Sequence, residues 1–298
     1  MYHAEDLPFS IKDIPDVFTN FRKKTEKDAL IRTAFGEPTQ IQSPEIETLK
    51  LPSSDALDLE ITPIDKRAAF QFKGGESEAL KRLNHYFFES KSISKYKETR
   101  NGLVGADYSS KFSAWLALGC ISPRFIYQEL KKYETQFGEN ESTYWLVFEL
   151  LWRDYFRFMM KKYNAKFFQQ AGIQDKGIPV NKHNMELLHD WIAGNTGVDF
   201  IDANMIELKL TGFMSNRGRQ NVASYLCNDL KLDWRFGAAY FEQQLIDYDV
   251  CSNWGNWAYL AGVGNDPRGN RYFNIEKQAQ DYDKNKEYRN LWLQRTAN

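Results

Sequence analysis

From Gly75 onward, apolar side chains recur every three or four residues, and the alternation typical of β-strands is nearly absent. Glu76–Ser90 is an example, with Ala79, Leu83, Tyr86 and Phe87 on one side. The same pattern predicts helices at Ser113–Gly119, Pro123–Tyr133, Ser142–Tyr163, Met185–Ala193, Phe200–Gly212, Ser215–Asp229, Trp234–Leu245, Asn253–Ala261 and Tyr288–Arg295. We therefore expect an all-α domain over residues 75–298, in which helix faces build any ligand site.

Residues 1–74 have a different character. They carry Pro8, Pro15, Pro38, Pro44, Pro52 and Pro63, out of nine prolines in the chain. A short helix is expected around Ile14–Lys24, and residues 36–66 read as an extended connector. Because so long an irregular segment rarely folds alone, we expect residues 1–74 to be an interdomain segment that wraps a larger body.

Composition excludes several classes of protein. With 298 residues, 42% hydrophobic and 27% charged, the chain is typical of soluble domains. A net charge of −1 gives no global basic field, although a local basic groove remains open. The first residues lack the features of a signal peptide, and no apolar run is long enough to span a membrane, so a cytoplasmic location is expected.

The cysteines and the aromatic residues indicate which kinds of ligand the chain could bind. The cysteines, Cys120, Cys227 and Cys251, have no zinc or iron–sulfur spacing, which favours buried thiols in a reducing compartment and no metal site. Aromatic residues make up 15% of the chain. Such rings stack on planar ligands and bases, or simply fill a core, and composition alone does not separate these alternatives.

The segment FELLWRDYFRFMMKKY places an acid, an indole and a guanidinium on one helix face. Glu149, Trp152, Arg153 and Phe156 fall at i, i+3, i+4 and i+7. One interpretation is an i,i+4 ion pair beside a core tryptophan. The other is a polar ligand site, because a glutamate on an otherwise apolar face needs a partner.

A second segment, TGFMSNRGRQNVASYL, places Asn216, Arg219 and Gln220 together near a helix start. An arginine there can pair with a carboxylate through two hydrogen bonds or bind a phosphate. A surface turn rich in Asn and Arg is the alternative interpretation.

A third segment, LIDYDVCSNWGNWAYLAGVGNDPRGNRYF, combines acids with aromatic rings. Asp247, Asp249 and Asn253 suit acid–base chemistry or cation binding, but the glycine of a calcium loop is missing. The rings here are Trp254, Trp257 and Tyr259, with Trp234 nearby in sequence. They form either a conducting stack or part of the core.

The fourth segment, YKETRNGLVGADYSSKFSAWLALGCISP, runs Ser109–Lys111 into a predicted helix. Hydroxyls and free N–H groups at a helix start bind phosphate or pyrophosphate. Many helices begin with serine, so this signal is weak by itself.

Together, in this order, the four segments resemble the photolyase/cryptochrome family. The opening YHAEDLPF…DIPDVFTNFRKK and the closing NWGNWAYLAGVGNDPRGNRYFN resemble its DASH branch in particular. The family combines an α/β antenna domain with a helical FAD domain, and residues 1–295 resemble only the interdomain region and the helical domain. Without the antenna domain, a bound folate antenna pigment is not expected.

The resemblance implies a U-shaped FAD inside the helical domain. The residues that match the phosphate-lining positions are Tyr96, Ser109, Ser110, Lys111, Phe112 and Ser113. Those expected around the rest of the cofactor are Glu149, Arg153, Asn216, Arg219, Asp247, Asp249 and Asn253. In this scheme Asp247 pairs with Arg219 over the ring system, Asp249 bonds its polar edge, and Asn253 faces the N5 atom.

The resemblance also implies blue-light-driven repair of cyclobutane pyrimidine dimers, preferentially in single-stranded DNA. Glu149 and Asn216 match catalytic positions, while Trp152 and Tyr259 match the aromatic walls around a flipped-out dimer. Flipping a base out costs a few kcal/mol in a duplex and less in a single strand. Arg217, Arg268 and Arg271 are candidates for contacts with the DNA backbone.

The chain departs from the family pattern at its tryptophans. Trp257 and Trp234 match the proximal and middle members of the electron-transfer chain, whereas the distal position falls on Asn181. Trp191, nearby in sequence, is a candidate for a branch of this chain, and a tyrosine is a candidate substitute for the distal member. Two tryptophans that border the dimer pocket in repair enzymes are replaced by Phe213 and Leu146.

Three functions remain open at this point. The first is a dimer-repairing enzyme, and the second is a non-enzymatic blue-light receptor that signals through a partner or nucleic acid. The third is a nucleic-acid-binding module without light chemistry. Self-association through apolar surface left by an absent antenna domain is a further expectation.

Overall fold

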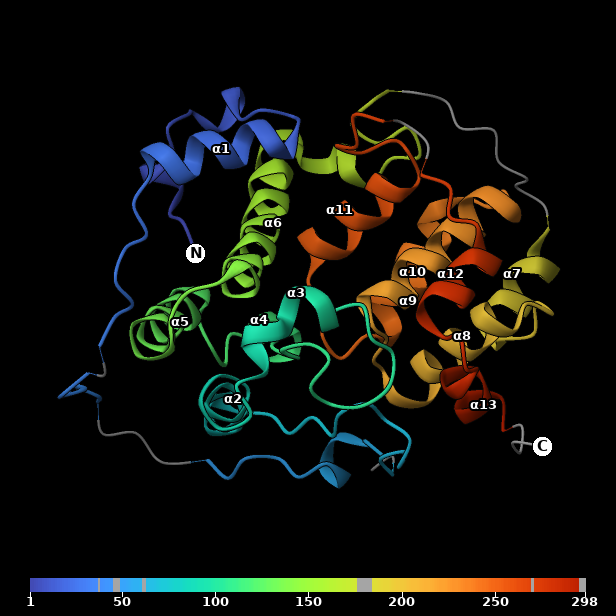
Figure 1. Ribbon diagram of the computed structural model, residues 1–298, viewed down its shortest axis with the longest axis horizontal. Coiled ribbons are helices and arrows are strands. Elements are labelled where there is room, and N and C mark those ends of the chain that lie inside the picture. Colours follow the sequence, from blue (N-terminus) through green and yellow to red (C-terminus); the bar gives the residue numbers. More distant parts are fainter. Residues whose placement is uncertain (37, 45–48, 61–62, 176–183, 269–270, 295–298) are drawn as a thin grey trace.

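The structure, a computed structural model, describes residues 1–36, 38–44, 49–60, 63–175, 184–268 and 271–294. All of its regular elements within these ranges are helical (Figure 1). The α-helices are α1 (Phe18–Asp28), α2 (Glu76–Asn84), α3 (Tyr96–Thr99), α4 (Ser113–Ala117), α5 (Pro123–Phe137), α6 (Glu141–Tyr163), α7 (Met185–Ala193), α8 (Asp199–Thr211), α9 (Asn216–Ser224), α10 (Trp234–Gln244), α11 (Val250–Leu260), α12 (Ile275–Tyr282) and α13 (Glu287–Leu293). The predicted all-α class is confirmed.

Helix α6 lies at the centre of one half of the molecule, in contact with α1, α3, α5 and α11 (Figure 1). Asn140 fixes its start, since the Oδ1 atom of Asn140 accepts hydrogen bonds from the backbone N–H groups of Ser142 and Thr143. The Thr143 hydroxyl bonds back to the backbone N–H of Asn140, which completes a capping box. Helices α2 and α4 lie in the same half as α6, and α7 to α10, α12 and α13 form the other half of the molecule, beyond α11.

Two predicted helices change their hydrogen-bond pattern near the end. The α-helix ends at Asn84 and at Ser224, and each continues as a π-helical turn, at His85–Glu89 and Tyr225–Asp229. The apolar spacing predicted the full extents but does not reveal a shift from i→i+4 to i→i+5 bonding. Helix α12 was not predicted, because only Ile275 and Ala279 are buried in a polar segment.

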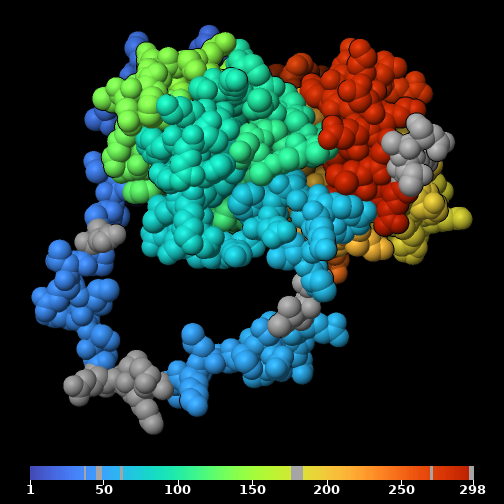
Figure 2. Space-filling model, turned by 60° about the horizontal axis from the view of Figure 1, so that its bottom comes forward, coloured from blue at the N-terminus to red at the C-terminus, as the bar shows by residue number. Residues whose placement is uncertain are grey.

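The first described residues, within the predicted interdomain segment, pack on the helical body, and the chain then leaves it. Helix α1 starts at Phe18, later than predicted, because Pro15 and its neighbours are extended before it. Between residues 38 and 60 the described residues are exposed, and a 3₁₀ turn at Asp55–Leu57 is their regular element. Figure 2 shows this stretch looping away from the body.

One hydrophobic cluster joins both predicted parts of the chain. It includes Ile14, Phe18 and Phe21 together with core residues from Ala79 onward. The Tyr155 hydroxyl of α6 donates a 2.6 Å hydrogen bond to the Asp16 carbonyl, 139 residues away in sequence. The first 28 residues therefore share the core of the helical body, while the division at residue 75 stays a prediction. Within the described residues, no helix is both long and apolar enough to cross a membrane.

Candidate functional site

A cavity of about 680 Å³ opens between α1, α6, α9 and α11, beside the loop that follows α11. A smaller cavity of about 90 Å³ continues it inward and shares Asn216, Arg219 and Asp247 with it. Asn253 and Trp257 line only the inner part. The combined space is in the size range of cofactor sites.

Helix α6 supplies one wall of this cavity. Glu149, Trp152, Arg153 and Phe156 share one face of α6, and all four line the cavity. Phe18 of α1 stacks on the Trp152 ring at 3.6 Å between centroids and 14° between planes. Tyr259 of α11 meets Trp152 edge-on, at 5.7 Å and 79°. Phe18 thus fixes the plane of Trp152 from behind, a role that sequence reasoning missed.

Glu149 has a partner that sequence reasoning also missed. The Nη1 atom of Arg100 donates a 2.7 Å hydrogen bond to its Oε1 atom. Burial raises the pKa of Glu149 above the ordinary range, although the Arg100 cation opposes that rise. The carboxyl is therefore easier to protonate than a surface glutamate and is placed to exchange hydrogen bonds with a ligand.

Arg219 and Asp247 form an ion pair at the junction of the two cavities. The Nη2 atom of Arg219 lies 2.8 and 3.0 Å from the two carboxylate oxygens of Asp247. The Nε atom of Arg219 donates to the Met214 carbonyl, and Ser215 caps the start of α9 just before it. The Asp247 side chain is 1% exposed, so the pair presents a fixed, oriented charge to the cavity.

Asp249 caps the start of α11 and holds two arginines of α6. Its Oδ1 atom accepts the backbone N–H of Ser252 at 2.9 Å, and its Oδ2 atom lies 3.2 Å from Arg157 and 3.6 Å from Arg153. Burial acts to raise the pKa of Asp249, but the Ser252 N–H and the arginines outweigh it and hold that pKa below the ordinary range. Nearby, the Asn253 amide donates to the Ala238 carbonyl at 2.9 Å.

The Ser109–Ser113 segment borders the cavity at its end, where Ser113 is exposed to it. Lys111 is 3% exposed at φ +62°, and its ammonium lies over the Tyr108 ring. Burial lowers the pKa of Lys111 well below the ordinary range. Ser110 and Phe112 of this segment are buried, and so is Tyr96 of α3.

Arg82 of α2, which sequence reasoning missed, holds the same segment in place. Its guanidinium donates to the carbonyls of Ala106, Ser109 and Ser110 at 2.9–3.1 Å and pairs with Asp107 at 2.7 Å. Because one buried guanidinium donates hydrogen bonds to all three carbonyls, it fixes the backbone before α4. The phosphate-lining role of the segment stays a prediction.

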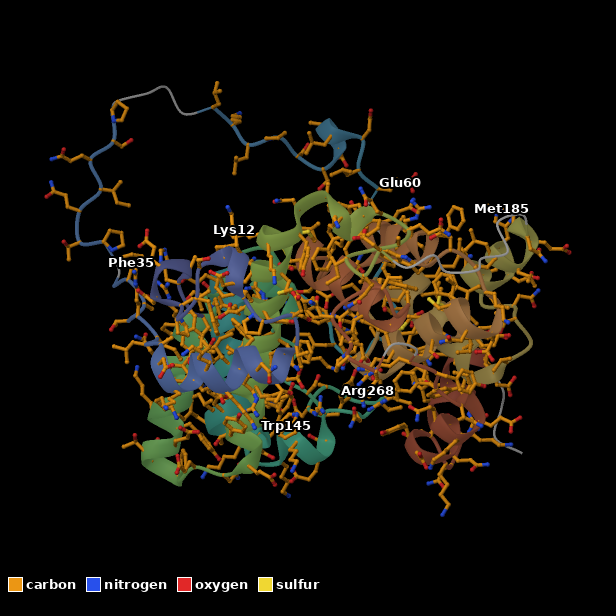
Figure 3. The ribbon with its side chains drawn as sticks, turned by 90° about the horizontal axis from the view of Figure 1, so that it is seen from above. Lys12, Phe35, Glu60, Trp145, Met185 and Arg268 are labelled. Atoms are coloured by element: carbon orange, nitrogen blue, oxygen red, sulfur yellow. The ribbon has the colours of Figure 1, made fainter. Side chains whose placement is uncertain are left out.

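The three arginines predicted to bind DNA are in different settings. Arg268 and Arg271 line the cavity mouth, and both pair with buried Asp266 (Figure 3 labels Arg268). Arg271 also lies over the Tyr259 ring, at 4.8 Å. Arg217 is instead bonded to Asn101 and lies over the Tyr282 ring at 4.4 Å. It therefore ties α9 to neighbouring segments rather than lining the cavity.

Of the predicted electron-transfer tryptophans, Trp257 lines the inner cavity and Trp234 does not. Trp257 packs against Gly237 of α10, where an added Cβ would lie 2.2 Å from its ring, one turn after Trp234. Trp191 is fully buried, 6.2 Å from Trp257 in an edge-on contact. Asn181 lies outside the described residues. Phe213 and Leu146 are buried and are not among the residues that line the described cavity.

The unsatisfied polar atoms around the cavity fit an anionic, planar cofactor. Arg100 and Arg153 line the cavity, and their Nε and Nη1 atoms, respectively, are buried and find no hydrogen-bond partner among the described residues. Buried donors without partners are costly unless a ligand satisfies them. Together with the aromatic walls and the inner Asn253, they suit a flavin nucleotide; when bound, that group supplies light absorption and one-electron chemistry.

Comparison with known proteins assigns the chain to a class. Residues 145–298 match the family model for the FAD binding domain of DNA photolyase. The chain belongs to the photolyase/cryptochrome family, in its DASH branch. It is 55% identical over 297 residues to cryptochrome DASH of Danio rerio, covering 98% of this chain and 57% of that protein.

Solved structures agree with this assignment. The crystal structure of Synechocystis cryptochrome superposes with a TM-score of 0.93 at 55% identity, over 98% of this chain and 60% of that one. A class III photolyase from Agrobacterium tumefaciens, 23% identical, shares the fold with a TM-score of 0.81 over 96% of this chain and 59% of that one. The family's cofactor is FAD. The chain spans little more than half the length of these relatives.

Proposed function

We propose that the chain uses FAD and blue light to split cyclobutane pyrimidine dimers, with a preference for single-stranded DNA. One observation carries the proposal: the Trp152 and Tyr259 rings and the Arg219–Asp247 pair line the same cavity. A pyrimidine dimer that enters this cavity would contact the two rings and lie beside a cofactor held by the ion pair.

The residues at the mouth support a nucleic-acid substrate. Arg268 and Arg271 bring positive charge to the rim, although the chain as a whole carries −1. Asn216 is exposed to the cavity at the start of α9, where its amide can pair with a base edge. Glu149 lies on the opposite wall, and its raised pKa suits it to share a proton with a pyrimidine.

Repair of dimer-containing oligothymidine under blue light tests the proposal. Glu149→Gln is expected to lower the repair rate about tenfold while retaining FAD, because one hydrogen bond of about 1–1.5 kcal/mol to the base is weakened. Glu186→Gln, an exposed acid on α7, is the matched control. Bound FAD without repair in the unaltered chain would instead favour a light receptor.

Three lesser proposals accompany the main one. We expect DNA to be the macromolecular partner, in single strands before duplexes, and the cytoplasm to be the location. Self-association is also proposed; Phe35, Leu49 and Leu51 of the connector are about nine-tenths exposed and offer apolar surface for it. A monomer by light scattering at micromolar concentration contradicts that last point.

A further inference from the structure

Asn265 lies in the loop after α11, and two contacts fix its position. Gly264, the preceding residue, packs so closely on α11 that an added Cβ would lie 2.7 Å from the backbone nitrogen of Tyr259. The side-chain amide of Asn265 donates a 3.2 Å hydrogen bond to the backbone carbonyl of Asp16, just before α1. Asn265 is 4% exposed, yet it lines the outer, 680 Å³ cavity together with Trp152 and Tyr259.

The hydrogen bond to Asp16 decides which way the amide faces. A carbonyl oxygen only accepts hydrogen bonds, so the amide nitrogen of Asn265 must face Asp16 and its Oδ1 atom must face away. The same carbonyl accepts a 2.6 Å hydrogen bond from the Tyr155 hydroxyl, which holds it in place. The Oδ1 atom of Asn265 is buried and has no hydrogen-bond partner within the described part of the chain. The residue therefore brings an oriented acceptor without a donor to the cavity wall.

An unpaired acceptor of this kind indicates a ligand that carries a donor. A buried polar atom without a partner destabilises the protein, and most such atoms in native structures are satisfied by protein groups, by water or by a ligand. A site with a fixed acceptor favours a ligand that supplies an N–H or O–H group. It rejects an analogue that brings a methyl group or a lone pair to the same place.

The surroundings of Asn265 indicate that this donor belongs to the substrate and not to the cofactor. Asn265 lines the outer cavity but not the inner one, where Asn253 and Trp257 lie. Arg268 and Arg271, which follow it in the chain, line the cavity mouth. The donor is therefore carried by the molecule that enters past these arginines.

We propose that Asn265 accepts a hydrogen bond from the imide N3–H group of a pyrimidine bound in the outer cavity. The inference deepens the proposed function and rests on its substrate, the pyrimidine dimer. A flipped-out base is read at its Watson–Crick edge, where thymine and uracil carry the N3–H donor. The N3 atom of neutral cytosine is an acceptor and would face the Oδ1 atom of Asn265 with a second lone pair. Dimers of thymine or uracil are therefore the preferred substrates.

Methylation of the dimer at N3 tests this contact, because it removes the donor and leaves the cyclobutane ring intact. Repair of dimer-containing oligothymidine and of its N3-methylated form is measured under blue light with FAD-loaded protein. Asn265→Ala is expected to lower kcat/KM for the unmethylated dimer about tenfold, equal to about 1.4 kcal/mol. The loss caused by methylation is expected to be about tenfold smaller in Asn265→Ala than in the unaltered chain, because the two changes remove the same contact. Asn195→Ala, at an exposed asparagine after α7, is the matched control and is expected to behave as the unaltered chain.

Binding in the dark gives a second readout that needs no light chemistry. Fluorescence anisotropy measures the Kd of the same two oligonucleotides, and the same difference between the two proteins is expected. Asn265→Asp keeps an acceptor oxygen and is expected to retain the loss caused by methylation, which a merely structural role of Asn265 does not predict. If Asn265→Ala does not fold or hold FAD, Asn265→Leu removes the polar atoms while keeping the bulk of the side chain.

The outcomes separate the contact from the proposed function. If methylation causes the same loss in the unaltered chain and in Asn265→Ala, in both repair and binding, the contact is wrong and the proposed function stands. If the unaltered chain binds dimers with the expected loss on methylation but does not repair them, the contact stands and light-driven repair fails. A chain that holds FAD but binds no dimer-containing DNA overturns both.

Discussion

Replacing Asp247 with asparagine should destabilise the protein by leaving a charge without its partner. The Asp247 side chain is 1% exposed and pairs with Arg219, which is 25% exposed, at 2.8 Å. Removing one member of a buried ion pair typically costs about 3–5 kcal/mol. Because Arg219 retains some contact with solvent, we expect a loss of about 3 kcal/mol, the lower end of that range.

Urea unfolding followed by circular dichroism measures the effect, and flavin absorbance after gel filtration reports cofactor retention. Asp281→Asn is the matched control, since its ion pair with Lys277 is largely exposed and is worth about 1 kcal/mol or less. If Asp247→Asn lowers the free energy of unfolding no more than this control does, the Arg219–Asp247 pair does not organise the site.

A double replacement distinguishes the orphaned charge from lost packing. Changing Arg219 and Asp247 together to leucine removes both charges and leaves apolar side chains of similar bulk. Such replacements are often neutral for stability. We expect the double variant to recover most of the stability that Asp247→Asn loses, but not FAD binding. Equal destabilisation in both variants would refute the electrostatic reasoning.

Three further predictions concern other described residues. Burial raises the pKa of Glu207 from 4.5 to about 7, so stability present below pH 4.5 is lost as the pH rises toward 7, by about 3 kcal/mol at most. Urea unfolding of Glu207→Gln at pH 5 and pH 8 should show a smaller change between the two pH values than the unaltered chain shows. Arg82→Ala leaves three carbonyls and Asp107 without their donor and should weaken FAD binding at least tenfold in equilibrium dialysis, whereas Lys81→Ala, an exposed neighbour, should not. Phe18→Ala removes the ring behind Trp152 and should raise the KM for dimer-containing DNA more than it lowers kcat; equal changes would contradict a positioning role.

Most of the helices could be predicted because their apolar spacing is a local property of the sequence. Helix α12 was missed since two buried residues, Ile275 and Ala279, give too short a pattern, although Asn274 caps its start. The π-helical turns at Tyr225–Asp229 and His85–Glu89 were also beyond prediction, because the side chains there suit either hydrogen-bond pattern.

In the candidate site, too, features carried by a single helix were predictable and contacts between distant segments were not. The α6 face was predictable from Glu149 to Phe156 because one helix presents it. The partners of that face could not be predicted: Arg100 bonds to Glu149 across 49 residues of sequence, and Phe18 of α1 stacks on Trp152. Such pairs depend on how the helices pack against one another. The spacing of apolar residues along a single helix does not encode that packing. The Arg219–Asp247 pair was anticipated only through the family resemblance.

The contact between the first helix and α6 has a consequence for synthesis of the protein. Phe18 and Phe21 are buried only when α6 is present, yet Asp16 and its partner Tyr155 are 139 residues apart. At about 5–20 residues per second, the ribosome needs about 7–28 s to make that interval. During that time Phe21 can stack on Phe9, but the aromatic face of α1 lacks its partners on α6, so chaperones that bind nascent chains would reach this helix before α6 does.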